Sequence, residues 1–428
     1  MIQKILVFFL LITSSIVSAQ RTSSSPYSNF GIGDRKNSRT VEQTAMGGTG
    51  VAFSHYKYLN FINPAAYSDL RFTTYSFGVS NTNLNVETSS ANQTVNTTTL
   101  DYLTLAFPIG KKAGLAIGLQ PYSNVGYSLG NIDDSGKETR FTGSGGVNEF
   151  YASFGIKMVK NFSLGIQASY YFGIINRGLL INNQTDLSIL GTNFKENSEI
   201  RGKSISIGAQ YKNVLKNKIT ISAGIKTALQ KKLNVSGNST LYSTSLQLGG
   251  LTPKDTRFQN ELSGAYILPL KSTLGVGIGK LDKWFVSAEY ETQKAISTLG
   301  TVTLDNVNFK YDDSNRISLG GYYLPNINSI SSYFQRITYR AGVYTEDSGI
   351  TINHSDTNNN FTALNTLGIS FGLGLPLKQM SSLNISLEYG QRGTIINNLI
   401  KENYFNVGLS LSLTASGFQT WFRERRID

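Results

Sequence analysis

The sequence predicts an all-β protein: a 14-stranded antiparallel transmembrane β-barrel with an N-terminal hatch, or plug, segment. Two observations predict this fold class. Apolar residues alternate with polar or small ones at every second position through much of the chain between residues 71 and 414. Short connections also alternate with long ones between these stretches. In addition, no apolar stripe with a helical period extends beyond two turns after the first 20 residues.

Composition narrows the classes of site that this chain can contain. Its 428 residues include 39 basic and 27 acidic side chains, a net charge of +12, and charged residues make up only 15%. Ordinary soluble domains have about 25%. The absence of cysteine excludes a disulfide scaffold, a thiolate zinc site and a cysteine nucleophile. With only two histidines, His55 and His354, we expect no metal and no cofactor.

Residues 1–19 have the layout of a secretory signal peptide. Lys4 supplies the positive charge, residues 5–11 are apolar, and Val17, Ser18 and Ala19 offer small residues before a cleavage site. The apolar run is shorter than the ~20 residues that a transmembrane helix needs. We therefore expect cleavage before Gln20 and export from the cytoplasm. The alternative is a buried N-terminal strand or helix.

The next segment, residues 20–70, is predicted to be the hatch. It has little periodicity, and Gly47, Gly48 and Pro64 indicate tight turns. The alternative is a disordered tail, but the segment is rich in tyrosine and phenylalanine, in which disordered tails are poor. A segment of this length before the first strand can fold into the lumen of a barrel.

Residues 71–414 are predicted to form the barrel. In the last strand, for example, Phe405, Val407 and Leu409 alternate with small polar residues. An even strand number depends on treating 258–280 as one strand interrupted at Pro269. The expected strands are 71–80, 102–110, 113–121, 149–159, 162–173, 203–212, 217–228, 258–280, 283–293, 315–324, 335–345, 365–377, 381–392 and 403–414.

The connections differ at the two ends of the predicted barrel. Long polar loops are expected at 81–101, 122–148, 174–202, 229–257, 294–314 and 346–364, and mostly short, basic turns at the other end. This asymmetry is typical of outer-membrane barrels. The barrel should be closed because backbone groups in hydrocarbon need partners. A soluble β-sandwich or propeller is the alternative. Residues 415–428 are predicted to form a basic periplasmic tail. The lysines of the chain are scattered over the short turns and form no single stripe, which argues against a nucleic-acid partner.

The N-terminal segment resembles a known family. Asn63, Pro64 and Ala65 follow a stretch that contains Gly47 and Gly48, as in the hatch of the long-chain fatty acid transporter (FadL-like) family. Residues 25–34, Ser-Pro-Tyr-Ser-Asn-Phe-Gly-Ile-Gly-Asp, are similar to the version found in Bacteroidetes. The resemblance implies a plugged barrel in the Gram-negative outer membrane that passes hydrophobic molecules, often through a lateral gap. It also implies that residues 63–65 brace the plug on the wall.

Several charges are predicted to face the lumen. The alternation places them in pairs on the polar faces of three strands. The pairs are Glu289 with Glu291, Arg336 with Arg340, and Glu388 with Arg392. Such charges can hold a hatch by ion pairs or line a polar path. General solvation of the lumen is the alternative.

Little in the sequence points to catalysis. Gly126, Ser128 and Gly130 match the Gly-x-Ser-x-Gly nucleophile pattern, but the strand–turn–helix context and a suitable histidine base are missing. The acid pairs at 133–134 and 312–313 fit solvated loops better than Ca²⁺ sites. We therefore expect no enzyme.

Three functions are compatible with these sequence features. The first, which we favour, is an outer-membrane channel for passive uptake of hydrophobic or amphipathic small molecules, gated by the hatch. The second is a non-transporting barrel that acts as an accessory subunit of a protein-secretion complex, the type IX translocon, with a large translocon protein as partner. The third is an outer-membrane enzyme. In each case the barrel wall would contact membrane lipid.

Overall fold

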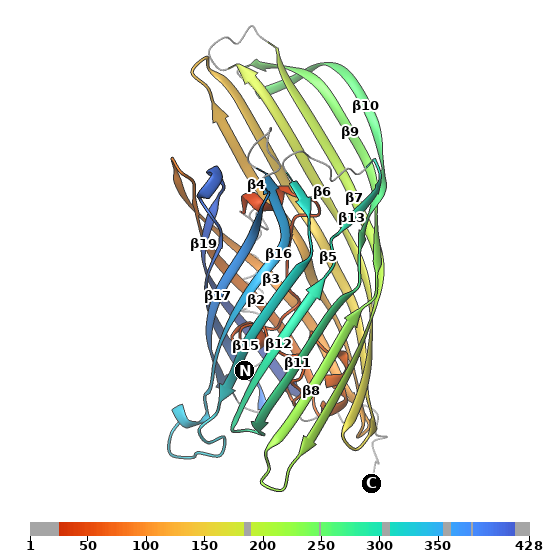
Figure 1. Cartoon of the computed structure of the whole chain (residues 1–428), viewed down its shortest axis with the longest axis vertical. Coiled ribbons are helices and arrows are strands. Elements are labelled where there is room, and N and C mark those ends of the chain that lie inside the picture. The colour runs from red at the N-terminus through yellow and green to blue at the C-terminus, as the bar shows by residue number, and fades with distance from the viewer. Residues whose placement is uncertain are drawn as a thin grey trace, which may run out of the picture.

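The computed structural model describes residues 25–183, 190–247, 250–301, 309–353, 361–377 and 380–415 (Figure 1). The predicted signal peptide, His354 and nearly all of the predicted basic tail lie outside the described residues. Within those residues, no helix has the length and apolar character needed to span a membrane.

The described strands form a closed antiparallel barrel of 14 strand paths, as predicted. β19 pairs with β2 from Lys401 opposite Glu87 to Ala415 opposite Thr73, which closes the ring. Ten of these paths are formed by the following elements: β2 (Thr73–Glu87), β3 (Asn92–Ile109), β4 (Ala113–Ile132), β5 (Lys137–Val159), β6 (Phe162–Asn183), β7 (Gly191–Val214), β16 (Thr338–Asn353), β17 (Phe361–Pro376), β18 (Ser382–Gly393) and β19 (Lys401–Ala415).

The other four paths each consist of two collinear pieces. They are β8 (Thr220–Ala228) with β9 (Lys231–Gln247), β10 (Gly250–Leu268) with β11 (Lys271–Lys280), β12 (Trp284–Gln293) with β13 (Ser297–Gly300), and β14 (Phe309–Tyr311) with β15 (Ser314–Tyr323). The predicted single strand interrupted at Pro269 is confirmed, because β10 and β11 pair with consecutive pieces of the same neighbouring path. Proline has no N–H for a ladder, so the break falls there.

The side-chain parity of the predicted strands is also observed. In β17, Leu367, Ile369 and Phe371 are exposed on the outer face, whereas Ser370 is fully buried on the inner face. In β19, Leu409 is exposed and Ser410 is buried. The exposed leucine, isoleucine and phenylalanine side chains of neighbouring strands form an apolar belt around the part of the barrel next to the short turns.

Five of the predicted long loops were wrong in extent. Most of residues 81–101, 122–148, 174–202, 229–257 and 346–364 belongs to strands. β2 and β3 extend toward a short connection, β16 and β17 extend into 346–364, and β4–β7, β9 and β10 continue far beyond the apolar belt. These extensions are rich in Asn, Ser, Thr and Gly, and their apolar residues, such as Val125, Ile175 and Val235, form one cluster on the inner face. The many polar and small residues weaken the alternation, so these stretches resemble loops in the sequence.

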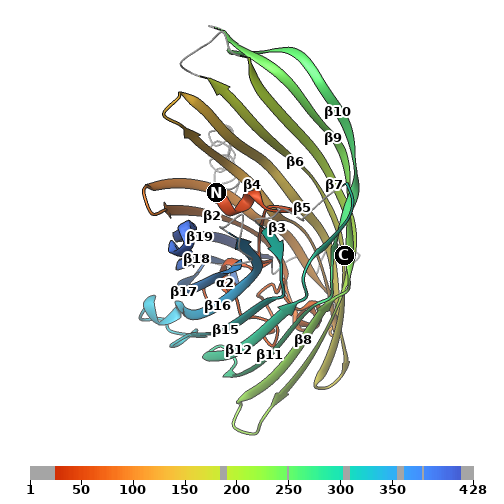
Figure 2. The ribbon, with the colours of Figure 1, turned by 45° about the horizontal axis from the view of Figure 1, so that its top comes forward.

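The extensions form a wall on one side of the barrel (Figures 1 and 2). β4, β5, β6, β7, β9 and β10 pair in that order and rise above the neighbouring strands. β3 and β4 pair only up to Leu103 opposite Leu119. Among the described residues, β10 pairs with β13 only over residues 264–267. In the part of the chain that the structure describes, the wall is therefore an open six-stranded sheet whose two edges are β4 and β10.

Residues 25–70 lie inside the ring of strands and are largely buried. This N-terminal segment contains η1 (Pro26–Asn29), β1 (Asp34–Arg35), α2 (Val41–Thr44) and η2 (Pro64–Asp69). The Thr40 side chain and Gln43 form a capping box that starts α2. Phe61, Tyr67 and Leu70 pack against inward-facing barrel residues such as Tyr102 of β3 and Tyr151 of β5. The segment thus has an apolar core with the inner wall.

Candidate functional site

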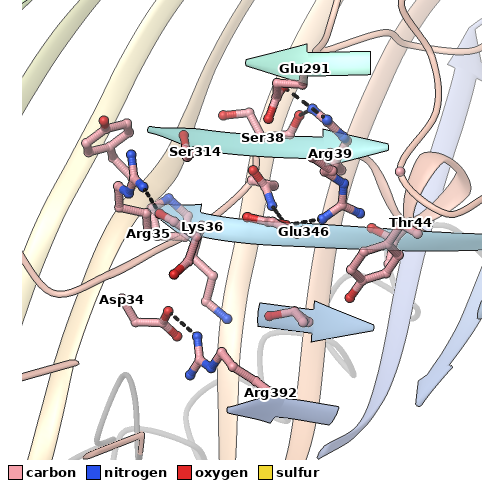
Figure 3. A pocket seen from close by; sticks show the side chains of 18 of the residues that line it. Asp34, Arg35, Lys36, Ser38, Arg39, Thr44, Glu291, Ser314, Glu346 and Arg392 are labelled. Carbon is pink, nitrogen blue, oxygen red and sulfur yellow. Dashed lines mark hydrogen bonds and ion pairs between the residues drawn. The ribbon is translucent and has the colours of Figure 1, made fainter. Parts of the chain in front are cut away.

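A cavity of about 340 Å³ lies between the N-terminal segment and the inner face of the barrel (Figure 3). Residues 34–39 and other parts of the N-terminal segment form one side, and residues of β2–β4, β8, β9, β11, β12 and β15–β19 line the other. Its lining mixes charged groups with tyrosine and leucine. The charged groups come from strands far apart in sequence, so only closure of the barrel brings them together.

Glu289 and Glu291 both contact the N-terminal segment. Arg39 lies 3.5 Å from Glu289 and 3.4 Å from Glu291, and Lys271 lies 2.8 Å from Glu291. The backbone N–H groups of Gly50 and Val51 donate to the Glu289 carboxylate at 2.9 and 2.7 Å. Since an unpaired buried carboxylate is costly, these contacts tie the segment to β12.

Arg392 forms a second tie. Its guanidinium lies 2.8 Å from Asp34 and 2.6 Å from Glu402, and it donates to Ser25 Oγ at 2.7 Å. Burial alone would raise the pKa of Asp34, but the Arg392 guanidinium holds the pKa of that carboxyl below its usual range. Glu402 was missed by the sequence analysis because it precedes the predicted start of the last strand.

The remaining predicted lumen charges do not meet one another. Glu388 accepts hydrogen bonds from Tyr344 and from Asn406. Arg340 donates to Asn384 at 3.3 Å and stacks over Tyr58 of the N-terminal segment. The predicted position of Arg336 was wrong. It lies in η3 (Phe334–Arg336), before β16 begins, and shares no strand face with Arg340.

Arg316 is a further contact that the sequence analysis missed. It forms an ion pair with Glu346 and donates to the Gly47 carbonyl oxygen at 3.1 Å. Gly47 also donates its N–H to Ser370 Oγ at 2.9 Å. Gly47 and Gly48 have φ values of 67° and 80°, which glycine adopts without strain. The Gly47–Gly48 turn thus contacts the inner wall.

Asn63, Pro64 and Ala65 lie against a glycine-lined part of the wall. The Asn63 side chain accepts the N–H of Ala65, and it donates to the carbonyl oxygens of Val51 at 2.7 Å and of Ala209 in β7 at 3.1 Å. A Cβ atom at the wall residue Gly165 would come within 2.3 Å of the Pro64 and Ala65 backbone. The close approach of these residues therefore requires glycine in the wall.

The short-turn end of the barrel holds the segment by a separate cluster. Asp69 lies 2.9 Å from Lys212 and also pairs with Lys157. Burial would raise the pKa of Asp69, but these two ammonium groups hold it well below its usual range. His55 lies 3.2 Å from Asp282 in the turn between β11 and β12. Burial lowers the pKa of His55 to about 4, although Asp282 opposes that shift.

The lowered pKa of His55 predicts a loss of stability in acid. Between the folded value of about 4 and the unfolded value of about 6.5, the unfolded chain binds the additional proton. Stability should therefore be unaffected by His55 above pH 7 and fall as the pH drops from 6.5 toward 4, by on the order of 3 kcal/mol. Melting temperatures of the wild type and of His55→Gln, compared at pH 7.5 and 4.5, measure this effect. An equal acid-induced decrease in both proteins would contradict it.

The cavity reaches the place where β3 and β4 separate. Thr97, Thr99 and Asp101 of β3 line it, as do Gln120 and Tyr122 of β4. At this level β1 replaces β3 as the neighbour of β4, with Asp34 opposite Asn124 and Arg35 opposite Ser123. The cavity therefore extends sideways to the point where β3 and β4 stop pairing. This point lies near the end of the apolar belt that is farther from the short turns.

The catalytic and metal patterns of the sequence do not form sites in the described residues. Gly126, Ser128 and Gly130 lie within the strand β4 and not at a strand–turn–helix junction. The Asp133 carboxylate accepts N–H groups of its own turn from Ser135 and Lys137. In the described ranges, no group of three His, Cys, Asp or Glu residues is placed to hold a metal ion.

The closed 14-stranded barrel with an N-terminal segment inside it has the fold of FadL-like outer-membrane barrels. A Pseudomonas aeruginosa FadL homologue aligns with a TM-score of 0.60 at 13% identity, over 89% of this chain and 98% of that chain. The Pseudomonas putida toluene transporter TodX aligns with a TM-score of 0.58 at 15% identity, over 89% and 98%. The CymD monoaromatic hydrocarbon channel aligns with 0.55 at 16%, over 90% and 99%.

The sequence places the chain in one particular family within this class. The BamG family model matches residues 1–428, and the chain belongs to that family. No curated protein matches the sequence.

Proposed function

We propose that this protein is an outer-membrane channel for passive uptake of small amphipathic molecules, in which residues 20–70 act as a plug. The observation that carries the proposal is the cavity between the N-terminal segment and the wall, which reaches the separation of β3 and β4. The similar structures include a toluene transporter and a monoaromatic hydrocarbon channel, which supports passage of small molecules through this fold. The apolar belt would contact membrane lipid.

The lining favours an amphipathic molecule over a pure hydrocarbon. Charged groups such as Asp101, Lys36 and Lys231 line the cavity together with Leu84 and Tyr122. An apolar molecule there would desolvate polar groups without replacing their hydrogen bonds, which is unfavourable. A molecule with a polar head and an apolar body would satisfy both kinds of lining.

The proposed route runs from the end with the long strands, through the cavity, to the separation of β3 and β4. By analogy with outer-membrane barrels, the short turns would face the periplasm and the one-sided wall would face outward. The resemblance of residues 25–34 to Bacteroidetes sequences supports an origin in that group. The route requires no catalytic residue.

A bulky side chain at Thr99 tests the route. Thr99 lines the cavity, whereas its neighbour Leu100 is exposed on the outer face. We expect Thr99→Trp to reduce octanoate entry into proteoliposomes to near the rate of protein-free liposomes, because it fills the lateral end of the cavity. Leu100→Trp is the matched control and should transport normally. Equal rates for both variants and the wild type would refute the route.

A second candidate function is an accessory subunit of a larger outer-membrane complex, of which the type IX translocon is one example. The one-sided open sheet favours it, since a wall that extends beyond the membrane offers a protein-binding surface. Purification of the tagged protein in mild detergent separates the two candidates. A large partner at near-equal stoichiometry supports the subunit, and a lone barrel with a bound amphiphile supports the channel.

A further inference from the structure

The two edges of the one-sided wall differ in how they resist strand addition. Along β10, the edge has a proline, two β-bulges and charges of both signs, which are the features that protect exposed strand edges. The bulges lie between Pro253 and Asp255 and between Thr256 and Phe258. The charged residues of this edge are Lys254, Asp255, Arg257 and Glu261.

The opposite edge, residues 126–132 of β4, has none of these features. Gly126 contacts Ser28, and in the described part of the chain no strand other than β5 pairs with residues 128–132. The sequence of this edge is Gly-Tyr-Ser-Leu-Gly-Asn-Ile, without proline or charge, and its ladder with β5 contains no bulge. An unprotected edge of this length presents a row of backbone donors and acceptors for another strand. Only the β10 edge therefore carries features that block strand addition.

The backbone directions identify which groups face outward along this edge. The Gly126 N–H donates to Ser28 Oγ at 3.2 Å, so it points away from β5. Because these directions alternate along a strand, the N–H groups of Ser128 and Gly130 point the same way. In the described part of the chain, the ladder of β4 with β1 ends at Asn124, and no strand faces Ser128 or Gly130.

The chain itself already uses the lower part of this edge for strand addition. β1 pairs antiparallel with Ser123 and Asn124, and the Lys36 N–H donates to the Tyr122 carbonyl at 2.9 Å. The strand pairing of the segment ends at Gly33, whose φ of 90° turns the backbone, and Ser28 of η1 then accepts the Gly126 N–H. A second extended segment placed beyond Gly126 would continue the antiparallel direction of the ladder that β1 starts.

The two faces of the edge define what such a segment must look like. Tyr127 and Leu129 belong to an apolar cluster on the concave face, together with Val125. Ser128 and Gly130 lie on the other, exposed face. The fitting segment therefore has apolar residues at every second position toward the concave face and polar residues between them.

A second copy of this chain does not fit that description through its own β4 edge. Two copies inserted in one membrane have the same orientation, so their β4 strands run in the same direction. They cannot form the antiparallel ladder that β1 starts. The β10 edge of a second copy is also excluded as the partner, because its proline, bulges and charges hinder strand pairing.

We propose that residues 128–132 of β4, beyond the Gly126 N–H that Ser28 already occupies, bind an extended segment of a partner protein by antiparallel β-strand addition. About five residues of the partner pair with this edge and extend the apolar cluster at Tyr127 and Leu129. This binding does not depend on passage of small molecules through the barrel, so it stands or falls separately from the channel function.

The absence of cysteine allows a clean crosslinking test. Ser128→Cys, labelled in intact cells with a benzophenone maleimide and irradiated, should form one discrete adduct with another protein. Gln259→Cys, exposed on the β10 edge, is the matched control and should form none. Mass spectrometry of adducts from Ser128→Cys, Gly130→Cys and Ile132→Cys, all at exposed positions, should place the contacted partner residues two apart and in reverse order, as an antiparallel ladder requires.

A proline variant separates strand pairing from simple proximity. Gly130→Pro removes an N–H that points to the free edge and leaves the β4–β5 ladder intact, and the nearest atom to a Cβ there is 3.7 Å away. In the Ser128→Cys background it should abolish the adduct. Four results would each overturn the proposal. They are the lack of an adduct at Ser128, an equally strong adduct at Gln259, an adduct with a second copy of this chain, and adducts whose contacted residues are not two apart. If Gly130→Pro does not fold, the Ser128 and Gln259 pair and the stepping pattern still decide.

Discussion

Deletion of residues 20–60 should leave a folded barrel that leaks small solutes. The strand ladders close without the N-terminal segment, because β19 pairs directly with β2 over the full length of both strands. The segment contributes the contacts that fill the lumen, including those of Arg39 with Glu289 and Glu291. Its removal exposes polar inner faces that water can solvate, as in open barrels.

Conductance in planar bilayers measures this leak. The full-length protein should show little or no steady conductance, and the deletion variant should show open-channel currents. Heat-dependent migration on gels and circular dichroism confirm that the variant is folded. A folded deletion variant that excludes small solutes as well as the full-length protein would contradict the proposed role of the segment as a plug.

The second large effect is expected from a single side chain in the wall. Gly165→Val places a Cβ within 2.3 Å of the Pro64 carbonyl carbon and the Ala65 nitrogen. These are backbone atoms, so neither can move aside as a flexible side chain would. Valine suits a strand, so β6 itself should tolerate it. The clash should displace the N-terminal segment or cost on the order of 1–3 kcal/mol of stability.

Protease sensitivity of the N-terminal segment and the melting temperature report these two outcomes. Gly130→Ala is the matched control, because the nearest atom to its Cβ is 3.7 Å away. We expect rapid cleavage within residues 25–70, or a clearly lower melting temperature, only for Gly165→Val. Identical behaviour of both variants and the wild type would show that the contact of Pro64 and Ala65 with the wall is unimportant.

The sequence alone determined the part of the fold that lies at the apolar belt. There each strand has lipid-facing and lumen-facing positions in strict alternation, as Ile369 and Ser370 show, so the strand number and the side-chain parity are readable. The break at Pro269 was readable because proline lacks the N–H. Beyond the belt many polar and glycine residues weaken this signal, so the six strands were predicted too short and their extensions were predicted as loops.

The site depended on the tertiary structure. Alternation places Glu289 and Arg392 on inner faces, but it contains no information about distance across a lumen. Closure of the barrel brings Asp34 to Arg392, 358 positions later in the chain, and the Gly47 carbonyl to Arg316. Arg336 was misplaced because a single 3₁₀ turn shifted the start of β16. Local patterns specify which way a side chain points, whereas its partner is decided by strand tilt and ring closure, which are properties of the whole barrel.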